Sequence, residues 1–205
     1  KETITKAATI DEIFKKQTGG KGQYARVKIK VEPSDVGEGF VFVNKIVGGS
    51  IPREYIPAVE RGMRDACKTG VLKGYPIEDV KITLIDGNHH PVDSSEMAFR
   101  AAGSIAFQKA IRQAGAILLE PIMAVEVVTP DEYLGDVMGD LTSRRGQIKG
   151  MIPRNDAQVL NADVPLAGMF GYATDLRSIT QGRAVFTMQF DHYSPAPASI
   201  AEKIN

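Results

Sequence analysis

Two adjacent histidines, His89 and His90, are the residues of this 205-residue chain whose type and spacing could most readily do chemistry. They lie in the segment DGNHHPVDSSEM, residues 86–97, which also supplies carboxylates and hydroxyls. Such groups can build a metal centre, a hydrolytic site with a nucleophile and a base, or a contact surface for another molecule. The rest of the sequence has to decide among these three.

A metal centre is disfavoured by the number of available ligands. Zinc sites use three or four protein side chains, whereas the third histidine, His192, lies in the other half of the chain. Adjacent side chains such as His89 and His90 also point in different directions and seldom bind one ion together. We therefore expect no metal site.

A hydrolytic site could be assembled from His90 as general base, with Asp93 and a neighbouring serine. The serines, however, lie where a helix is expected to begin. Asp93-Ser94-Ser95-Glu96 predicts a capping box, with Asp93 as the cap and Glu96 reaching back. The sequence contains no G-x-S-x-G elbow, and Cys67 lies on an apolar helix face where an inert thiol is expected. A free-standing enzyme that uses His90 as its base stays an alternative of a different class.

The glycine-rich segment QTGGKGQY, residues 17–24, is the other candidate for chemistry. It fits neither the P-loop nor the dinucleotide-binding pattern, and it joins two strands instead of opening a helix. Lys21, Gln23 and Tyr24 would then be protruding hydrogen-bonding groups on a loop. Such groups suit contact with the backbone or the bases of RNA.

Charge and composition are consistent with a nucleic-acid contact in the first half of the chain. The net charge is zero, but residues 1–116 hold 18 basic against 14 acidic residues. Arg53, Arg61, Arg64 and Lys68 gather on one side of a predicted helix, a pattern that fits either phosphate contact or an ordinary solvated face. The sequence shows no apolar run long enough to span a membrane and no secretory signal, and its one cysteine cannot form an internal disulfide. We expect a cytoplasmic protein.

Periodicity predicts the elements that must position these residues. Strands are expected around residue 4 and at residues 10–14, 27–31, 40–47 and 80–85. A helix is expected after GGSIP, with Val59 and Met63 on its apolar face, and another from residue 96 to about 114 that is largely buried and includes Met97. From Gly115 the expected order is strand 122–128, helix 130–143, strand 146–151, strand 157–164, helix 169–178 and strand 183–190. This βαββαβ order is the ferredoxin-like arrangement. With a short helix at 198–204, the prediction is an α+β protein of two domains.

Several longer segments resemble one family. They are GGSIPREYIPAVERG at residues 48–62, VDSSEMAF at 92–99, LEPIMAVEVVTP at 119–130, GDVMGDLTSRRGQIKGM at 135–151 and PLAGMFGYATDLRSITQGRA at 165–184, together with QTGGKGQY. Over essentially its whole length the chain resembles the C-terminal part of bacterial elongation factor G, a translational GTPase. The resemblance implies that residues 1–116 form that family's domain IV and residues 117–205 its domain V with the C-terminal helix.

The resemblance also implies a fold and a site. Domain IV would resemble the second domain of ribosomal protein S five, and its two tip loops would enter the A site of the small ribosomal subunit during translocation. Residues SRRGQ would be a second ribosome contact. The implied tip residues are Gly19, Gly20, Lys21, Gly22, Gln23, Tyr24, Gly87, Asn88, His89 and His90, and the second contact is Ser143, Arg144, Arg145, Gly146 and Gln147.

Partners and cofactors follow from the same resemblance. The expected partners are rRNA of both subunits, A-site tRNA and mRNA, and proteins of the stalk base, bound by a monomer with no membrane contact. No cofactor is expected in this chain, because it contains no Walker A element; GTP and Mg²⁺ would bind the G domain of a longer parent protein. The chain by itself should not hydrolyse GTP. A paralogue specialised in ribosome recycling or in tetracycline protection stays open as the parent.

Overall fold

The computed structural model describes residues 1–17 and 19–204, so Thr18 of the glycine-rich loop and Asn205 lie outside the described residues. The chain divides into two compact units. The first holds Lys1–Leu118 together with the segment that begins at Ala196, and the second holds Leu119–Pro195. Each unit combines a sheet with helices, which confirms the predicted α+β class. None of the described helices is long and apolar enough to cross a membrane.

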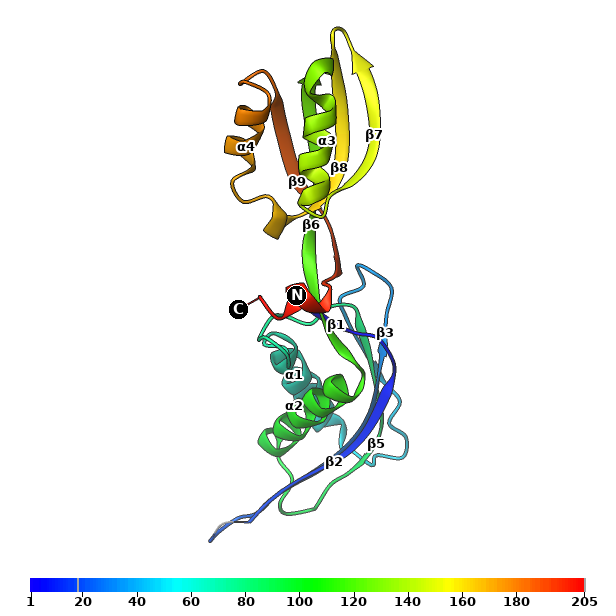
Figure 1. The fold of residues 1–205 in the computed structure, drawn as a ribbon. Coiled ribbons are helices and arrows are strands. Elements are labelled where there is room, and N and C mark those ends of the chain that lie inside the picture. Colours follow the sequence, from blue (N-terminus) through cyan, green and yellow to red (C-terminus); the bar gives the residue numbers. More distant parts are fainter. Residues whose placement is uncertain (18, 205) are drawn as a thin grey trace. The chain divides into compact units, whose positions relative to one another are not determined.

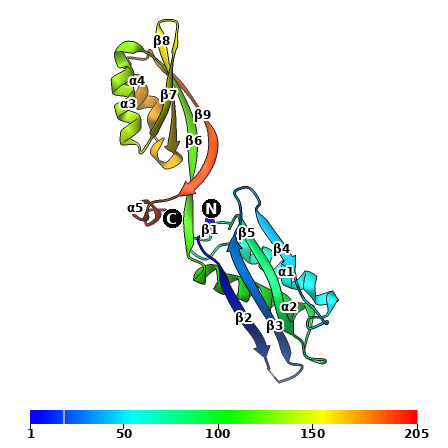
Figure 2. The ribbon, with the colours of Figure 1, turned by 90° about the vertical axis from the view of Figure 1, so that its right-hand side faces the viewer.

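The first unit is built on a four-stranded sheet with the order β2-β3-β5-β4. Its strands are β2 (Ala8–Lys16), β3 (Gln23–Pro33), β5 (Val80–Asn88) and β4 (Phe40–Asn44). The pairs β2–β3 and β3–β5 are antiparallel, whereas β4 runs parallel to β5. Helices α1 (Ile56–Cys67) and α2 (Glu96–Gln113) cover one face of this sheet, and the other face is left open (Figures 1 and 2).

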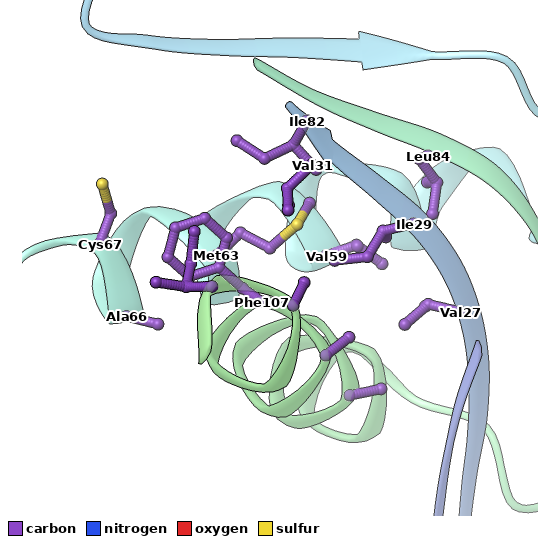
Figure 3. Close-up of a cluster of buried hydrophobic side chains, with 14 of the residues drawn as sticks. Val27, Ile29, Val31, Val59, Met63, Ala66, Cys67, Ile82, Leu84 and Phe107 are labelled. Carbon is purple, nitrogen blue, oxygen red and sulfur yellow. The ribbon is translucent and has the colours of Figure 1, made fainter. Parts of the chain in front are cut away.

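The core of the first unit lies between the sheet and the two helices (Figure 3). Alternate residues of β3, including Val27, Ile29 and Val31, are fully buried, because successive strand side chains point to opposite faces. They meet Val59 and Met63 of α1. The helical face predicted around these two residues is confirmed by their burial.

The two helices approach each other through glycine. A Cβ atom added at Gly62 would lie 2.1 Å from the carbonyl oxygen of Arg100, and one at Gly103 would lie 2.6 Å from that of Val59. Any larger residue would push the helices apart. The expectation that Met97 joins the buried face of α2 is wrong: its side chain is 68% exposed, because α2 buries mainly small residues against α1.

A short first strand, β1 (Glu2–Ile4), pairs with the start of β6 (Ala116–Pro130). Glu2 is fully buried, and its carboxylate accepts hydrogen bonds from the backbone N–H groups of Val71, Leu72, Lys73 and Tyr75 at 2.9 to 3.1 Å. The loop after α1 is therefore wrapped around one carboxylate. The sequence pattern around Glu2 does not indicate this role.

The second unit has the predicted βαββαβ order. Its antiparallel sheet is ordered β7-β8-β6-β9, and two helices pack on it. The elements that follow β6 are α3 (Leu134–Ser143), β7 (Gln147–Arg154), β8 (Ala157–Pro165), α4 (Tyr172–Ile179) and β9 (Val185–Pro195). Short 3-10 turns, Arg53–Tyr55, Asp131–Tyr133 and Leu166–Gly168, precede α1, α3 and α4. The ferredoxin-like prediction is confirmed.

The C-terminal helix differs from its prediction. Helix α5 covers only Ala198–Ala201, one turn where residues 198–204 were expected. The segment also groups with the first unit, whereas the predicted boundary placed it in the second domain. The reason is that β9 ends at Pro195 and the next backbone N–H, that of Ala196, donates to the carbonyl oxygen of Leu118 at 3.0 Å.

Candidate nucleic-acid interface

The two predicted tip segments lie at the same end of the first unit (Figures 1 and 2). Strands β2 and β3 form a hairpin in which Lys16 pairs with Gln23. Gln23 and Tyr24 are therefore the first residues of β3 and not part of the turn itself. The second segment connects β5 to α2 and contains His89 and His90.

Hydrogen bonds join the two segments directly. The Tyr24 N–H donates to the carbonyl oxygen of Asp93 at 3.0 Å, and the Ser94 hydroxyl donates to the carbonyl oxygen of Tyr24 at 2.7 Å. The same hydroxyl accepts from the His90 N–H at 2.8 Å. The rings of Tyr24 and His90 meet edge to face, with centroids 6.5 Å apart. Ser94 thus fixes the position of His90 relative to the hairpin, a role that the sequence did not reveal.

A glycine just after the predicted strand 80–85 suggests a turn, but Gly87 does not turn the chain. Strand β5 continues to Asn88, and Gly87 is buried opposite Val27. A Cβ atom at this position would lie 2.4 Å from the carbonyl oxygen of Arg26 and 2.4 Å from Cδ1 of Ile51. Glycine is needed here for a close approach of chains. Gly87 therefore contributes to the tip only through packing, because it has no side chain that could contact a partner.

The helix cap also differs from its prediction. The N-cap of α2 is Ser95, whose hydroxyl accepts from the Ala98 N–H at 3.1 Å, and not Asp93. Glu96 is consequently the first residue of the helix and is too early to complete a capping box with Ser95. Asp93 and Ser94 are instead used by the loop, in bonds with Tyr24 and His90.

The two histidines have different surroundings. Nδ1 of His90 accepts hydrogen bonds from the backbone N–H groups of Val92 and Asp93, at 3.2 and 3.1 Å. The neutral ring therefore carries its hydrogen on Nε2. Nδ1 of His89 lies 3.1 Å from the carbonyl oxygen of Ser50, to which it can only donate. His89 thus ties the loop to the residues before α1, while His90, with 51% of its side chain exposed, presents an N–H group.

A pocket of about 250 Å³ opens between the two tip segments. It brings together residues from β2, the hairpin turn, β3 and the loop after β5. Its lining residues are Lys15, Lys16, Gln17, Gly22, Gln23, Tyr24, His90 and Asp93. Gly22, Gln23, Tyr24 and His90 were predicted as tip residues, and the structure brings them together.

The other lining residues, Lys15, Lys16, Gln17 and Asp93, were not predicted from the sequence. Hairpin pairing could have found two of these residues, because Lys15 lies opposite Tyr24 and Lys16 opposite Gln23. Asp93 could not be found in this way, since its place depends on the contact between the two segments. A Cβ atom at Gly22 would lie 3.1 Å from Oδ2 of Asp93, so the carboxylate rests on the hairpin backbone. Of the other predicted tip residues, Gly19, Gly20, Lys21, Asn88 and His89 are exposed outside this pocket.

The geometry does not assemble the hydrolytic alternative, as far as the described residues go. The Ser94 hydroxyl donates to a backbone carbonyl, and Nδ1 of His90 is occupied by two backbone N–H groups. Acyl transfer needs a nucleophile that donates to the imidazole and a carboxylate that orients the ring. Cys67 is buried with its thiol 3.1 Å from the carbonyl oxygen of Ile77, and burial raises its pKa to about 11, which fits the predicted inert thiol.

The predicted basic side of α1 is largely balanced by its own neighbours. Arg64 stacks over the ring of Phe40 at 4.5 Å and pairs with Glu60 at 3.0 Å. Lys68 pairs with Asp65 at 3.6 Å. Arg53 and Arg61 are exposed. Only part of this side is therefore available to an anionic partner.

The predicted second contact, Ser143–Gln147, follows α3 and is held firmly within the second unit. Arg144 pairs with Asp140 and Asp175, and its guanidinium lies over the ring of Tyr172. Arg145 pairs with the buried Glu120, and this hydrogen bond raises the pKa of the guanidinium. Both cations therefore have structural partners. Ser143 donates to the carbonyl oxygen of Asp140, Gly146 packs closely against Leu141, and Gln147 is exposed. A ribosome contact at this segment stays a prediction.

The second unit also contains a cluster that the sequence did not suggest. Asp163, Asp191 and His192 have ligand-type atoms within 4.8 Å of one another. The cluster is open to solvent, and Nζ of Lys149 lies 3.4 Å from Oδ2 of Asp163. Nδ1 of His192 lies 2.5 Å from Oδ2 of Asp191. The carboxylates thus already have partners within the chain.

Comparisons with known proteins agree over the whole chain. Residues 1–115 match the family described as "Elongation factor G, domain IV", and residues 117–204 match "Elongation factor G C-terminus". The fold is also similar to a crystal structure of a protein from Thermus thermophilus, with a TM-score of 0.87 and 42% sequence identity. That alignment covers 98% of this chain and 30% of the Thermus chain, so the present chain spans less than a third of that relative.

Proposed function

The chain belongs to the elongation factor G family, and on that premise we propose that it is the ribosome-contacting module of a factor that promotes GTP-dependent translocation of tRNA and mRNA. The first unit would insert its tip into the A site of the small subunit. The second unit would contact rRNA and proteins at the stalk base. Such a module acts in the cytoplasm, where ribosomes work, and its energy comes from GTP hydrolysed elsewhere in the parent protein.

The observation that carries this proposal is the joining of the two tip segments. Tyr24 and His90, which are far apart in the sequence, are held together by the bonds of Asp93 and Ser94. A narrow hairpin end with lysines, an amide and an imidazole offers donors to phosphates, bases and ribose hydroxyls. The side chains of the two tip segments are positioned by strands and a buried helix. The tip can therefore transmit force to a bound partner without its contact residues moving apart.

The test is pre-steady-state translocation by the full-length parent carrying Gln23→Ala and His90→Ala together. We expect slower movement of mRNA with GTP hydrolysis on the ribosome largely retained, because the substitutions lie outside any nucleotide site. His192→Ala, an exposed histidine of the second unit, is the matched control. Translocation at the parental rate in the double variant would refute the role of the tip. An effect on ribosome splitting alone would assign the parent to recycling.

The chain by itself should have no GTPase activity. We propose this because the glycine-rich segment joins β2 to β3 of a hairpin, whereas a P-loop leads from a strand into a helix whose N-terminus binds phosphate. Incubation of the isolated chain with GTP should release no phosphate above the buffer rate. Release that His90→Ala abolishes would contradict the proposal and would favour the enzyme alternative.

A further inference from the structure

The loop that follows α1, residues 70–75, has the form of an anion receptor. Four of its backbone N–H groups converge on the carboxylate of Glu2, two on each oxygen, at 2.9 to 3.1 Å. Two glycines allow this convergence, since Gly70 has a φ of +36° and Gly74 a φ of +78°. Successive N–H groups in such turns form a concave site for an anion. In this chain the site is filled by the chain's own side chain.

Strand β1 contacts the same loop through its backbone. The Glu2 N–H donates to the carbonyl oxygen of Pro76 at 2.9 Å, and the Glu78 N–H donates to the carbonyl oxygen of Glu2 at 3.0 Å. The loop buries little apolar surface of its own, because Leu72 and Lys73 are exposed. A segment that is held by hydrogen bonds and has few buried apolar contacts opens at a lower free energy than the core of its domain.

The end of this loop covers Cys67, the last residue of α1 (Figure 3). The Cys67 thiol donates to the carbonyl oxygen of Ile77 at 3.1 Å, and the Ile77 N–H donates to the carbonyl oxygen of Cys67 at 2.8 Å. Burial raises the pKa of the thiol to about 11, so the closed loop keeps it protonated and unreactive. Movement of the loop away from α1 would break both bonds and expose the sulfur.

We propose that β1 and residues 69–78 form a latch, in which the loop is a receptor for a carboxylate and Glu2 is the ligand that closes it. The latch opens as a unit while the sheet and both helices of the first unit stay folded. Opening withdraws the carboxylate, frees four N–H groups for another carboxylate, and exposes Cys67. The latch lies at the end of the first unit opposite the β2–β3 hairpin (Figure 1), so it does not depend on the ribosome contact proposed above.

Thiol labelling of the 205-residue chain with an aromatic disulfide measures the opening, because Cys67 is its one cysteine. At about pH 8, near the ordinary pKa of a cysteine, the exposed thiol reacts. When reclosing outpaces labelling, the rate reports the population of the open form. We expect the logarithm of this rate to rise with urea at a slope well below that of global unfolding, because only one loop is exposed. A slope equal to that of global unfolding would overturn the latch.

Substitution of the carboxylate should favour the open form. Glu2→Gln should be labelled at least about thirtyfold faster, since one amide oxygen is left to serve two pairs of N–H groups. Glu12→Gln is the matched control, because the Glu12 side chain is only 13% exposed and pairs with Lys109 at 2.8 Å, but lies on β2. Its labelling rate should change by less than about twofold. Equal acceleration in the two variants would contradict the proposal.

Chemical rescue tests the receptor itself. Glu2→Ala removes the carbon and oxygen atoms of one acetate ion, so acetate can refill the site. Sodium acetate should slow the labelling of this variant in proportion to its concentration. Sodium chloride at the same ionic strength should not, nor should acetamide, which has a single acceptor oxygen. Equal slowing by acetate and acetamide, or no slowing by acetate, would refute the receptor. Glu2→Gln preserves the side-chain volume, so the labelling comparison decides the proposal even if Glu2→Ala does not fold.

Discussion

Replacement of Glu2 by glutamine tests how strongly one buried carboxylate organises the first unit. Its Oε1 accepts from the N–H groups of Val71 and Leu72, both at 2.9 Å. Its Oε2 accepts from those of Lys73 and Tyr75, at 3.0 and 3.1 Å. The Glu2 side chain is fully buried, so water cannot reach its carboxylate. Glutamine has nearly the same shape but only one oxygen.

The magnitude follows from this geometry. In Glu2→Gln the amide oxygen can serve one pair of N–H groups, and the NH₂ group then faces the other pair. Two backbone donors of these part-buried bonds lose their acceptor, at about 1–3 kcal/mol each, so the free energy of unfolding should fall by roughly 2–6 kcal/mol. Glu54→Gln is the matched control, because Glu54 is exposed; a change within about 0.5 kcal/mol is expected there.

Urea unfolding followed by circular dichroism gives the free energy, and hydrogen exchange gives the location. In Glu2→Gln the amides of Val71, Leu72, Lys73 and Tyr75 should exchange faster, because their loop opens more often. Amides of the second unit, such as that of Leu160, should keep their rates. A loss below about 0.5 kcal/mol with unchanged exchange in the loop would refute the reasoning that these four bonds stabilise the unit.

Three further predictions concern other parts of the first unit. Ser94→Ala should lower stability by about 1 kcal/mol and speed exchange of the His90 amide, since two hydrogen bonds are lost; unchanged exchange would argue against the joining role. Gly87→Ala should cost about 1–3 kcal/mol in thermal or urea unfolding because its Cβ would clash, whereas Gly150→Ala has open space and should change little. Burial raises the pKa of Cys67 from 9.0 to about 11, so the folded state holds the proton more tightly. The stabilisation that results from this raised pKa is complete below pH 9 and is lost as the pH rises towards 11. The difference in the free energy of unfolding between the parent and Cys67→Ala should therefore shift in that range and stay constant from about pH 6 to 8.

Local pattern was sufficient for most of the elements. The alternation of Val27, Ile29 and Val31 predicts a strand with one buried face, and the spacing of Val59 and Met63 predicts a helix, because burial follows the period of the backbone. The βαββαβ order of the second unit is likewise a property of the sequence. The family, too, was recognisable from contiguous segments, and the comparisons confirm it.

Where local pattern failed, the deciding contact came from a distant part of the chain. Gly87 suggested a turn, yet it is glycine because Ile51 and the backbone of Arg26 pass too close for a Cβ atom. Asp93 suggested a helix cap, yet Tyr24 and His90 use the residues before Ser95 for a loop contact. A single side chain can satisfy several local motifs, and only its neighbours in space select one.

The sequence by itself determined the two sheets, the helices that cover them and the residue types at the tip. Tertiary structure alone decided which nitrogen of His90 faces outward, that Lys16 and Asp93 share its pocket, and that Glu2 holds a loop some 70 residues away in the chain. The physical reason is that periodicity encodes which side of an element is buried, whereas hydrogen-bond partners depend on the register and distance between elements that only the folded chain brings together.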